Sequence, residues 1–174
     1  MKKLYIIIWI LMLLLLFILV LSSCTRTVTL YFTSMEGSEF YLVPETRQID
    51  SSVNMFEQAV RELVKGPYDK GIYPTLPHDV TVNSVKIMNR LAIVDFDISI
   101  ISNFEDIPHS STMETLALYS ITNTLTEFEE VDRVKITIEG KESGQVDGFF
   151  VEDFWGHVGI YEEFVRNEEI IKDE

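Results

Sequence analysis

The sequence predicts an α+β domain in two layers, in which a mainly antiparallel sheet carries two helices on one of its faces. Strand-type runs come in pairs separated by short turn-type segments, and helix-type runs with their own start and stop signals lie between the pairs. The order along the chain is strand, strand, helix, strand, strand, helix, strand. Hairpins that alternate with helices in this way form a sheet whose apolar face the helices cover.

The first hairpin is predicted from two β-branched and aromatic runs, Val28–Phe32 and Glu39–Val43. The turn-type cluster Met35-Glu36-Gly37-Ser38 separates them. Pro44 follows the second run and has no N–H to donate to a neighbouring strand, so it marks an edge or a bulge.

A first helix is predicted after the hairpin. Asn54 and Glu57 approximate a capping box, although Ser51 and Ser52 are also plausible N-caps. Gly66 and Pro67 supply the stop signal, a left-handed cap followed by a residue that cannot continue a helix. One face of this helix gathers its apolar residues, namely Val53, Phe56, Val60, Leu63 and Val64.

The second hairpin consists of Val80–Met88 and Leu91–Phe96, joined at Asn89-Arg90. The apolar residues of the first run change parity partway along it, which predicts a bulge near Asn83-Ser84. The segment from Ile98 to Pro108 shows no regular pattern.

The second helix is predicted to begin at Ser111, because Ser111 to Glu114 has the pattern of a capping box. The last strand, Val134–Ile138, alternates apolar and polar residues and ends at Gly140. The inward stripe of the helix is correctly spaced but partly polar, and consists of Met113, Leu116, Ala117, Ser120, Thr124, Leu125 and Phe128.

The C-terminal extension is too apolar to be a free tail. Phe149, Phe150, Phe154 and Trp155 are expected to form a lid on the core, with an exposed contact patch as the alternative. Residues 28–166 are therefore assigned to a single domain, and residues 167–174 to an acidic tail that frays.

The N-terminus has the layout of a secretory signal peptide. Lys2 and Lys3 precede an apolar run of 18 residues, Leu4 to Leu21, and the small residues after it end on Cys24. This arrangement resembles a bacterial lipobox, which predicts a signal peptide over residues 1–23, lipidation of Cys24 and a short tether over residues 24–27. An uncleaved transmembrane anchor and a signal peptide without lipid are the alternatives.

All three interpretations of the N-terminus place the rest of the chain outside the cytoplasm, and the lipobox interpretation places it at the outer face of the cell membrane. The formal net charge of −14 becomes −16 without Lys2 and Lys3. Nucleic acid and anionic lipid headgroups should repel such a surface, so nucleic acid is excluded as a partner. With Cys24 committed to lipid there is no disulfide, and packing alone must stabilise the domain.

An ordered series of short motifs resembles the GerMN (germane) domain of bacterial sporulation and spore-germination lipoproteins. The motifs are Val28–Phe32, Leu42–Arg47, Leu63–Pro67, Leu76–Pro77, Val85–Ile87, Val94–Phe96, Asn123–Thr126, Val131–Asp132 and Val134–Lys141. The chain departs from the pattern in having Asn89-Arg90 where such proteins commonly have Asn-Gly, and in having one such domain where the namesake has two. The resemblance implies a fold similar to ring-building motifs and a non-enzymatic role in assembling an envelope complex, with protein partners or self-association and no cofactor.

The sequence contains no strong catalytic motif. His109-Ser110-Ser111 is the one place where His and Ser are adjacent, and Ser111 is better explained as a helix cap. The histidines, at positions 78, 109 and 157, lack the spacing of metal ligands. Asp95 and Asp97 share one face of a strand, so the alternative function is a lipid-anchored hydrolase that acts on cell-wall glycans through paired carboxylates.

Overall fold

The computed structural model describes residues 25–103 and 105–172, together with residues 2, 5, 9, 10 and 12. Cys24 and most of the predicted signal peptide lie outside this part of the chain, so the lipidation of Cys24 stays a prediction. Within the described residues, no helix is both long and apolar enough to cross a membrane.

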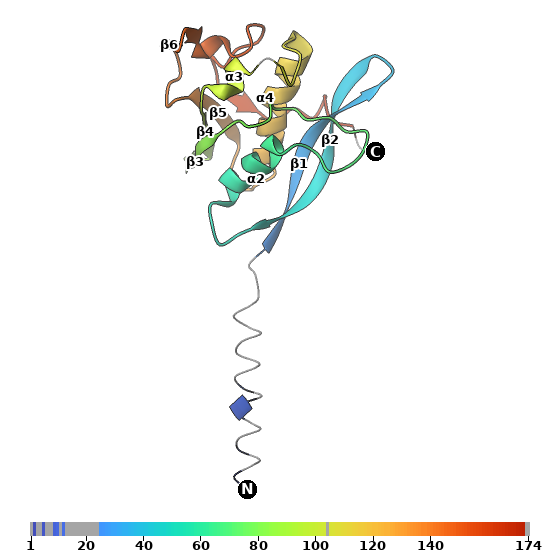
Figure 1. Ribbon diagram of the computed structural model, residues 1–174, viewed down its shortest axis with the longest axis vertical. Helices are drawn as coiled ribbons and strands as arrows, with labels where there is room; N and C mark the ends of the chain where they lie inside the picture. The colour runs from blue at the N-terminus through green and yellow to red at the C-terminus, as the bar shows by residue number, and fades with distance from the viewer. Residues whose placement is uncertain are drawn as a thin grey trace.

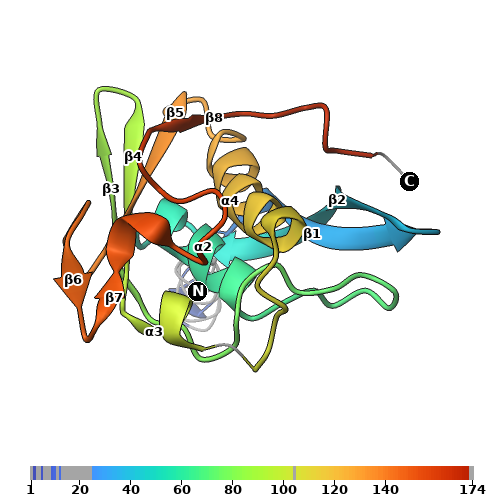
Figure 2. The ribbon, with the colours of Figure 1, turned by 90° about the horizontal axis from the view of Figure 1, so that it is seen from above.

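The α+β fold and the predicted order of elements are confirmed. Helices α2 and α4 lie between the β1–β2 hairpin and the larger sheet, as both ribbon views show (Figure 1, Figure 2). The elements are β1 (Thr25–Glu36), β2 (Glu39–Asp50), α2 (Met55–Val64), β3 (Val82–Met88), β4 (Leu91–Phe96), α3 (Ser99–Ser102), α4 (Ser111–Leu125), β5 (Arg133–Ile138), β6 (Gln145–Val146), β7 (Phe149–Phe150), a 3-10 turn (Val151–Asp153) and β8 (Phe164–Val165).

The strands form three sheets rather than one. The largest has the order β3-β4-β5-β8, while β1-β2 and β6-β7 are separate two-stranded sheets. Most pairings are antiparallel as predicted, but β4 and β5 are parallel. The reason is that α4 connects them as a crossover, which returns the chain to the same end of the sheet before β5 begins.

The β1–β2 hairpin is longer than predicted. Thr25, Arg26 and Thr27 were assigned to a tether, yet they begin β1 and pair with residues 50 to 48 of β2. Strand β2 continues through Pro44, whose missing N–H costs no ladder bond because Pro44 lies on the edge side of the strand. The edge interpretation of Pro44 is therefore confirmed.

The local signals around the helices are largely confirmed. Asn54 is the N-cap of α2 and its side chain accepts a hydrogen bond from the Glu57 N–H, while Gly66 has a φ of +78° after the end of the helix. The prediction that Val53 lies on the apolar face of this helix is wrong, because Val53 precedes the helix and is exposed. The N-cap of α4 is Ser110 rather than Ser111, since Ser110 Oγ accepts from the Met113 N–H.

The second hairpin matches its prediction closely. The register of β3 against β4 shifts between Val82 and Ser84, which confirms the predicted bulge. The turn at Asn89 and Arg90 has φ values of +50° and +63°. Two successive left-handed residues are typical of the type I′ turns that fit the twist of a hairpin, so Arg90 adopts the conformation that glycine would take more readily.

The main core is formed by the hairpin, the helices and the largest sheet together, and includes fully buried Phe32, Phe96, Leu118 and Ile136. A smaller cluster of Tyr31, Leu42 and Leu116 packs on the other face of the hairpin, against Ile170 and Ile171. The predicted fraying of residues 167–174 is therefore wrong for residues 167–172. The Leu42 N–H donates to the Ile170 carbonyl (2.7 Å), and the Lys172 N–H donates to the Leu42 carbonyl (2.9 Å).

Candidate functional site

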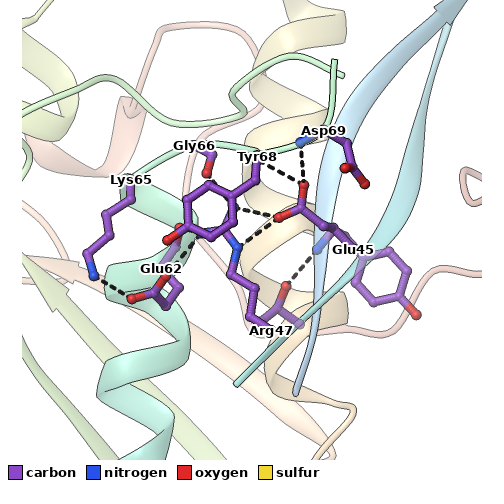
Figure 3. Close-up of polar contacts among 9 residues, drawn as sticks. Glu45, Arg47, Glu62, Lys65, Gly66, Tyr68 and Asp69 are labelled. Carbon is purple, nitrogen blue, oxygen red and sulfur yellow. Dashed lines mark hydrogen bonds and ion pairs between the residues drawn. The ribbon is translucent and has the colours of Figure 1, made fainter. Parts of the chain in front are cut away.

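Two of the motifs that carry the family resemblance meet in space. Strand β2 contributes Glu45 and Arg47, and the end of α2 with the loop after it contributes Glu62, Gly66 and Tyr68 (Figure 3). We call these five residues the β2–α2 junction. Because strand residues two apart share a face, both Glu45 and Arg47 point toward the helix, where they are 7% and 5% exposed.

Arg47 is the centre of the junction. Its Nε and Nη2 donate to Glu45 Oε1 (2.8 and 2.6 Å), its Nη2 also donates to the Gly66 carbonyl (2.6 Å), and its Nη1 donates to the carbonyl and Oε2 of Glu62 (both 3.0 Å). Five hydrogen bonds match the five N–H groups of a guanidinium. The ring of Tyr68 covers the guanidinium, with its centroid 3.7 Å from Cζ. Arg47 therefore has no N–H left for a ligand.

Glu45 ties the loop after α2 to the strand. Its Oε2 accepts from the N–H groups of Tyr68 (2.9 Å) and Asp69 (3.1 Å), while its Oε1 accepts from Arg47. Both carboxylate oxygens are thus satisfied, as a buried carboxylate requires. Glu45 and Arg47 together fix the position of α2 on the hairpin.

Glu62 completes the charge balance of the junction. Burial alone would raise the pKa of the Glu62 carboxyl, but hydrogen bonds from Lys65 and Arg47 outweigh it and lower this pKa below its ordinary value. Buried Arg47 within the junction and exposed Lys65 beside it therefore stabilise the ionised form of Glu62.

Two polar residues in the inward stripe of α4 hydrogen-bond the backbone of β1 at its outer edge. Ser120 Oγ donates to the Tyr31 carbonyl (2.6 Å), and the Tyr31 N–H donates to Thr124 Oγ1 (3.2 Å). Thr75 Oγ1 also lies 2.8 Å from Ser120 Oγ. These side chains satisfy the backbone N–H and C=O of Tyr31, so α4 blocks strand pairing at this position of the outer edge of β1.

The C-terminal segment is tied to the same region. The Tyr31 hydroxyl donates to Glu127 (2.6 Å) and accepts from Arg166 Nη2 (2.8 Å), while Asn123 exchanges two hydrogen bonds with the backbone of Asn167 (both 2.9 Å). Burial and the hydrogen bond to Glu127 raise the pKa of Tyr31 to about 12. The hydroxyl therefore stays protonated at neutral pH and acts as a structural donor.

Asp95 and Asp97 are each held by local hydrogen bonds. Asp95 accepts from Thr137 Oγ1 (2.8 Å), the Gly140 N–H (2.7 Å) and Asn83 Nδ2 (3.1 Å). Asp97 accepts from the Thr81 N–H (3.0 Å) and from the Ser99 hydroxyl. These bonds fasten the ends of β3, β4 and β5 together, so each carboxylate has a structural explanation.

The structure brings two of the three histidines together. His157 Nε2 lies 3.3 Å from the His109 carbonyl, and the His109 ring stacks on Trp155 with centroids 4.5 Å apart. Burial lowers the pKa of His109, and the nearby charge of Glu114 opposes this shift. His78 is exposed, and its carbonyl accepts from Asn103 Nδ2 (3.2 Å). No cluster of three side chains that could hold a metal ion occurs within the described residues.

Glu114 is a buried structural position that the sequence does not identify. It was assigned to a capping box, but it is fully buried and accepts three backbone N–H groups, from Trp155 (3.4 Å), His157 (2.8 Å) and Gly159 (2.8 Å). A charged residue at the start of an apolar helix face was the available signal. Its partners lie more than forty residues further along the chain, so local spacing could not identify them.

The aromatic cluster acts mainly as a lid. Trp155 and Phe154 are 6% and 5% exposed, and Trp155 Nε1 donates to the Ile100 carbonyl (2.8 Å). Phe150 is the exception and stays exposed. The lid interpretation is confirmed for Trp155 and Phe154.

The buried polar residues of the fold thus serve to connect its elements. Hairpin, helices and C-terminal segment are joined by the β2–α2 junction and by the contacts of α4. These features define a small α+β module in which residues of the short sequence motifs hold the secondary-structure elements together.

Comparison with known proteins assigns the module to a family. Residues 29–144 match the family Germane, described as sporulation and spore germination. The spore germination protein GerM of Bacillus subtilis (strain 168) is 30% identical over 122 residues, which cover 68% of this chain and 33% of GerM. The chain belongs to the Germane family.

Solved structures agree with this assignment. The tandem GerMN domains of B. subtilis GerM match with a TM-score of 0.64 and 26% identity, over 87% of this chain and 49% of the other. The first GerMN domain alone matches with a TM-score of 0.55 and 28% identity, over 79% of this chain and 99% of the other. The chain spans about a third of the length of GerM, so it corresponds to part of that protein.

Proposed function

We propose that this chain is a lipoprotein anchored through Cys24 to the outer face of the cell membrane, where it supports the assembly of an envelope complex in sporulation or spore germination without catalysing a reaction. The observation that carries the proposal is that the motif residues of this Germane domain are engaged in internal bonds. Arg47, Glu45 and Asn123 each build the domain rather than an open reactive centre.

The lipid anchor is supported by the sequence around Cys24 and by the position of Thr25. Thr25 follows Cys24 directly and is the first residue of β1, so the domain would sit close to the bilayer. Anchored proteins meet in two dimensions, which raises their effective concentration and makes weak lateral contacts sufficient for assembly. A small domain whose described motif residues are engaged in internal bonds is suited to such a role.

The anchor can be tested by labelling cells with palmitate and comparing the wild type with Cys24→Ala. We expect labelled, membrane-bound wild-type protein, and an unlabelled variant whose processing at residue 24 is lost. Equal labelling of both proteins would contradict lipidation at Cys24.

The assembly role can be tested by crosslinking intact sporulating cells and recovering the full chain from their membranes. We expect crosslinked envelope proteins in the wild-type sample and their loss when crosslinker is omitted. Recovery of the uncrosslinked chain alone would contradict the proposal. Release of soluble glycan from purified cell walls by the purified chain would instead support the hydrolase alternative.

A further inference from the structure

A groove lies at the turn end of the β1–β2 hairpin, which projects away from the largest sheet (Figure 2). Its volume is about 370 Å³, within the range of small-molecule and peptide-side-chain sites. Its walls come from the hairpin, from the loop after α2, from the segment before α4 and from the first turn of α4. The apolar residues that line it are Met35, Phe40, Tyr73, Pro74, Ile107 and Met113.

Three large apolar side chains of the groove remain open to water. Met35, Phe40 and Tyr73 are 46%, 39% and 49% exposed. Burial of apolar surface is worth about 25 cal/mol per Å², so covering them would supply a substantial driving force. Exposed apolar surface that lines a hollow is typical of an interaction site.

The edge of β1 that borders the groove is only partly hydrogen-bonded within the described residues. Thr33 and Tyr73 exchange two backbone hydrogen bonds (3.1 and 2.7 Å), which form a bridge of a single residue pair on the outer side of β1. Because backbone direction alternates along a strand, the N–H and C=O of Met35 point to that same side. Among the described residues, no partner hydrogen-bonds to them there.

A second polar group points to the same conclusion. Thr33 lines the groove and is 2% exposed, and its hydroxyl has no hydrogen-bond partner in the described part of the chain. A buried hydroxyl without a partner costs free energy.

The charge around the groove is acidic. Asp106 lines it, and Glu36 and Glu39 flank the hairpin turn with side chains 77% and 80% exposed. Lys172 lies 3.5 and 3.7 Å from these two glutamates, which leaves an excess of negative charge. A partner segment with a basic residue would complement this rim.

We propose that the groove binds an extended segment of a partner protein that adds a strand to β1 at Met35, with alternate apolar side chains between Phe40 and Ile107 and a basic residue at the acidic rim. Main-chain hydrogen bonds supply affinity in this mode of recognition, and the side-chain pockets supply specificity. Strand β1 runs for 12 residues from Thr25, so at roughly 3.3 Å per residue the groove would stand some 30 Å from the anchor. The inference rests on the proposed assembly role, and it names the face that meets the partner.

The test uses the full chain in nanodiscs of uncharged lipid, with empty nanodiscs as the blank, and fluorescent capped peptides of alternating valine and threonine. One peptide has a lysine at each end, a second has a glutamate at each end, and a third repeats the lysine peptide with N-methylated central residues. Fluorescence anisotropy measures binding. We expect saturable binding of the lysine peptide, and at least tenfold weaker binding of the other two peptides.

Variants locate the site. Met35→Glu should weaken the lysine peptide at least tenfold, whereas Met88→Glu should change its affinity less than twofold. The two methionines are matched, since each lies on a strand just before a hairpin turn and is exposed, 46% for Met35 and 58% for Met88. Thermal unfolding checks that both variants fold, and if Met35→Glu fails to fold, Tyr73→Ser replaces it.

Three results would overturn the inference. They are an absence of saturable binding at peptide concentrations up to about 1 mM, equal binding of the N-methylated peptide, and equal affinity of wild type and Met35→Glu. Peptide-independent dimers that Met35→Glu abolishes would overturn it in favour of a second copy in the groove. The crosslinking experiment tests the assembly role without reference to the groove, so the two proposals can fail separately.

Discussion

Replacing Arg47 by methionine should destabilise the domain more than any surface substitution of the same kind. Methionine keeps an unbranched apolar stem but leaves Glu45 and Glu62 without their shared cation, at a position where the arginine side chain is only 3% exposed. Removing one partner of a buried ion pair costs about 3–5 kcal/mol. At roughly 2–4 °C per kcal/mol for a chain of this length, Tm should fall by about 6–20 °C.

Urea unfolding followed by tryptophan fluorescence measures this change in the free energy of unfolding. Arg133→Met is the matched control, because Arg133 and Glu163 form a pair whose side chains are 43% and 38% exposed, and such pairs are worth at most about 1 kcal/mol. The double variant Glu45→Gln with Arg47→Met should recover part of the loss, since it removes one uncompensated buried charge. A loss for Arg47→Met no larger than that for Arg133→Met would refute the reasoning.

Three further predictions concern the loop around Glu114 and its neighbour His109. Gly159→Ala should destabilise the fold more than Gly71→Ala. Both glycines have a positive φ, but only at Gly159 would an added Cβ lie 2.6 Å from a backbone oxygen. Thermal unfolding compares the two variants, and equal Tm values would contradict the prediction. Glu114→Gln should lower the free energy of unfolding by about 1–3 kcal/mol, because it leaves a buried backbone N–H without an acceptor. It should also speed amide hydrogen exchange at residues 155–159, and unchanged exchange there would argue against the prediction. The pKa of His109 is lower in the folded chain than its ordinary value of 6.5, so the unfolded chain binds more protons and stability should fall as pH drops through this range. Urea titrations at about pH 7.5 and 5.5 should show a smaller difference in the free energy of unfolding between the two pH values for His109→Phe than for the wild type. An equal difference would contradict the assignment to His109.

Much of the fold was predictable because its signals are local. The cap at Asn54, the stop at Gly66, the bulge near Ser84 and the turn at Asn89 each depend on residues a few positions apart, and the structure confirms all four. Such features follow from backbone sterics and from short-range hydrogen bonds.

The site was less predictable because its contacts are long-range. Alternation along β2 places Glu45 and Arg47 on one face, but nothing local shows that this face meets the end of α2. The polar stripe of α4 has correct helical spacing, yet only the structure explains Ser120 and Thr124, which hydrogen-bond the edge of a strand about ninety residues earlier.

The sequence by itself determined the order of strands and helices, the turns between them and the resemblance to the Germane family. The tertiary structure decided that β4 and β5 run parallel, that the hairpin forms its own sheet, and that residues 167–172 pack against β2. It also decided the partners of Arg47 and Glu114. The physical reason is that a buried charge is stable only where several donors or acceptors converge on it, and that convergence comes from distant segments brought together by packing.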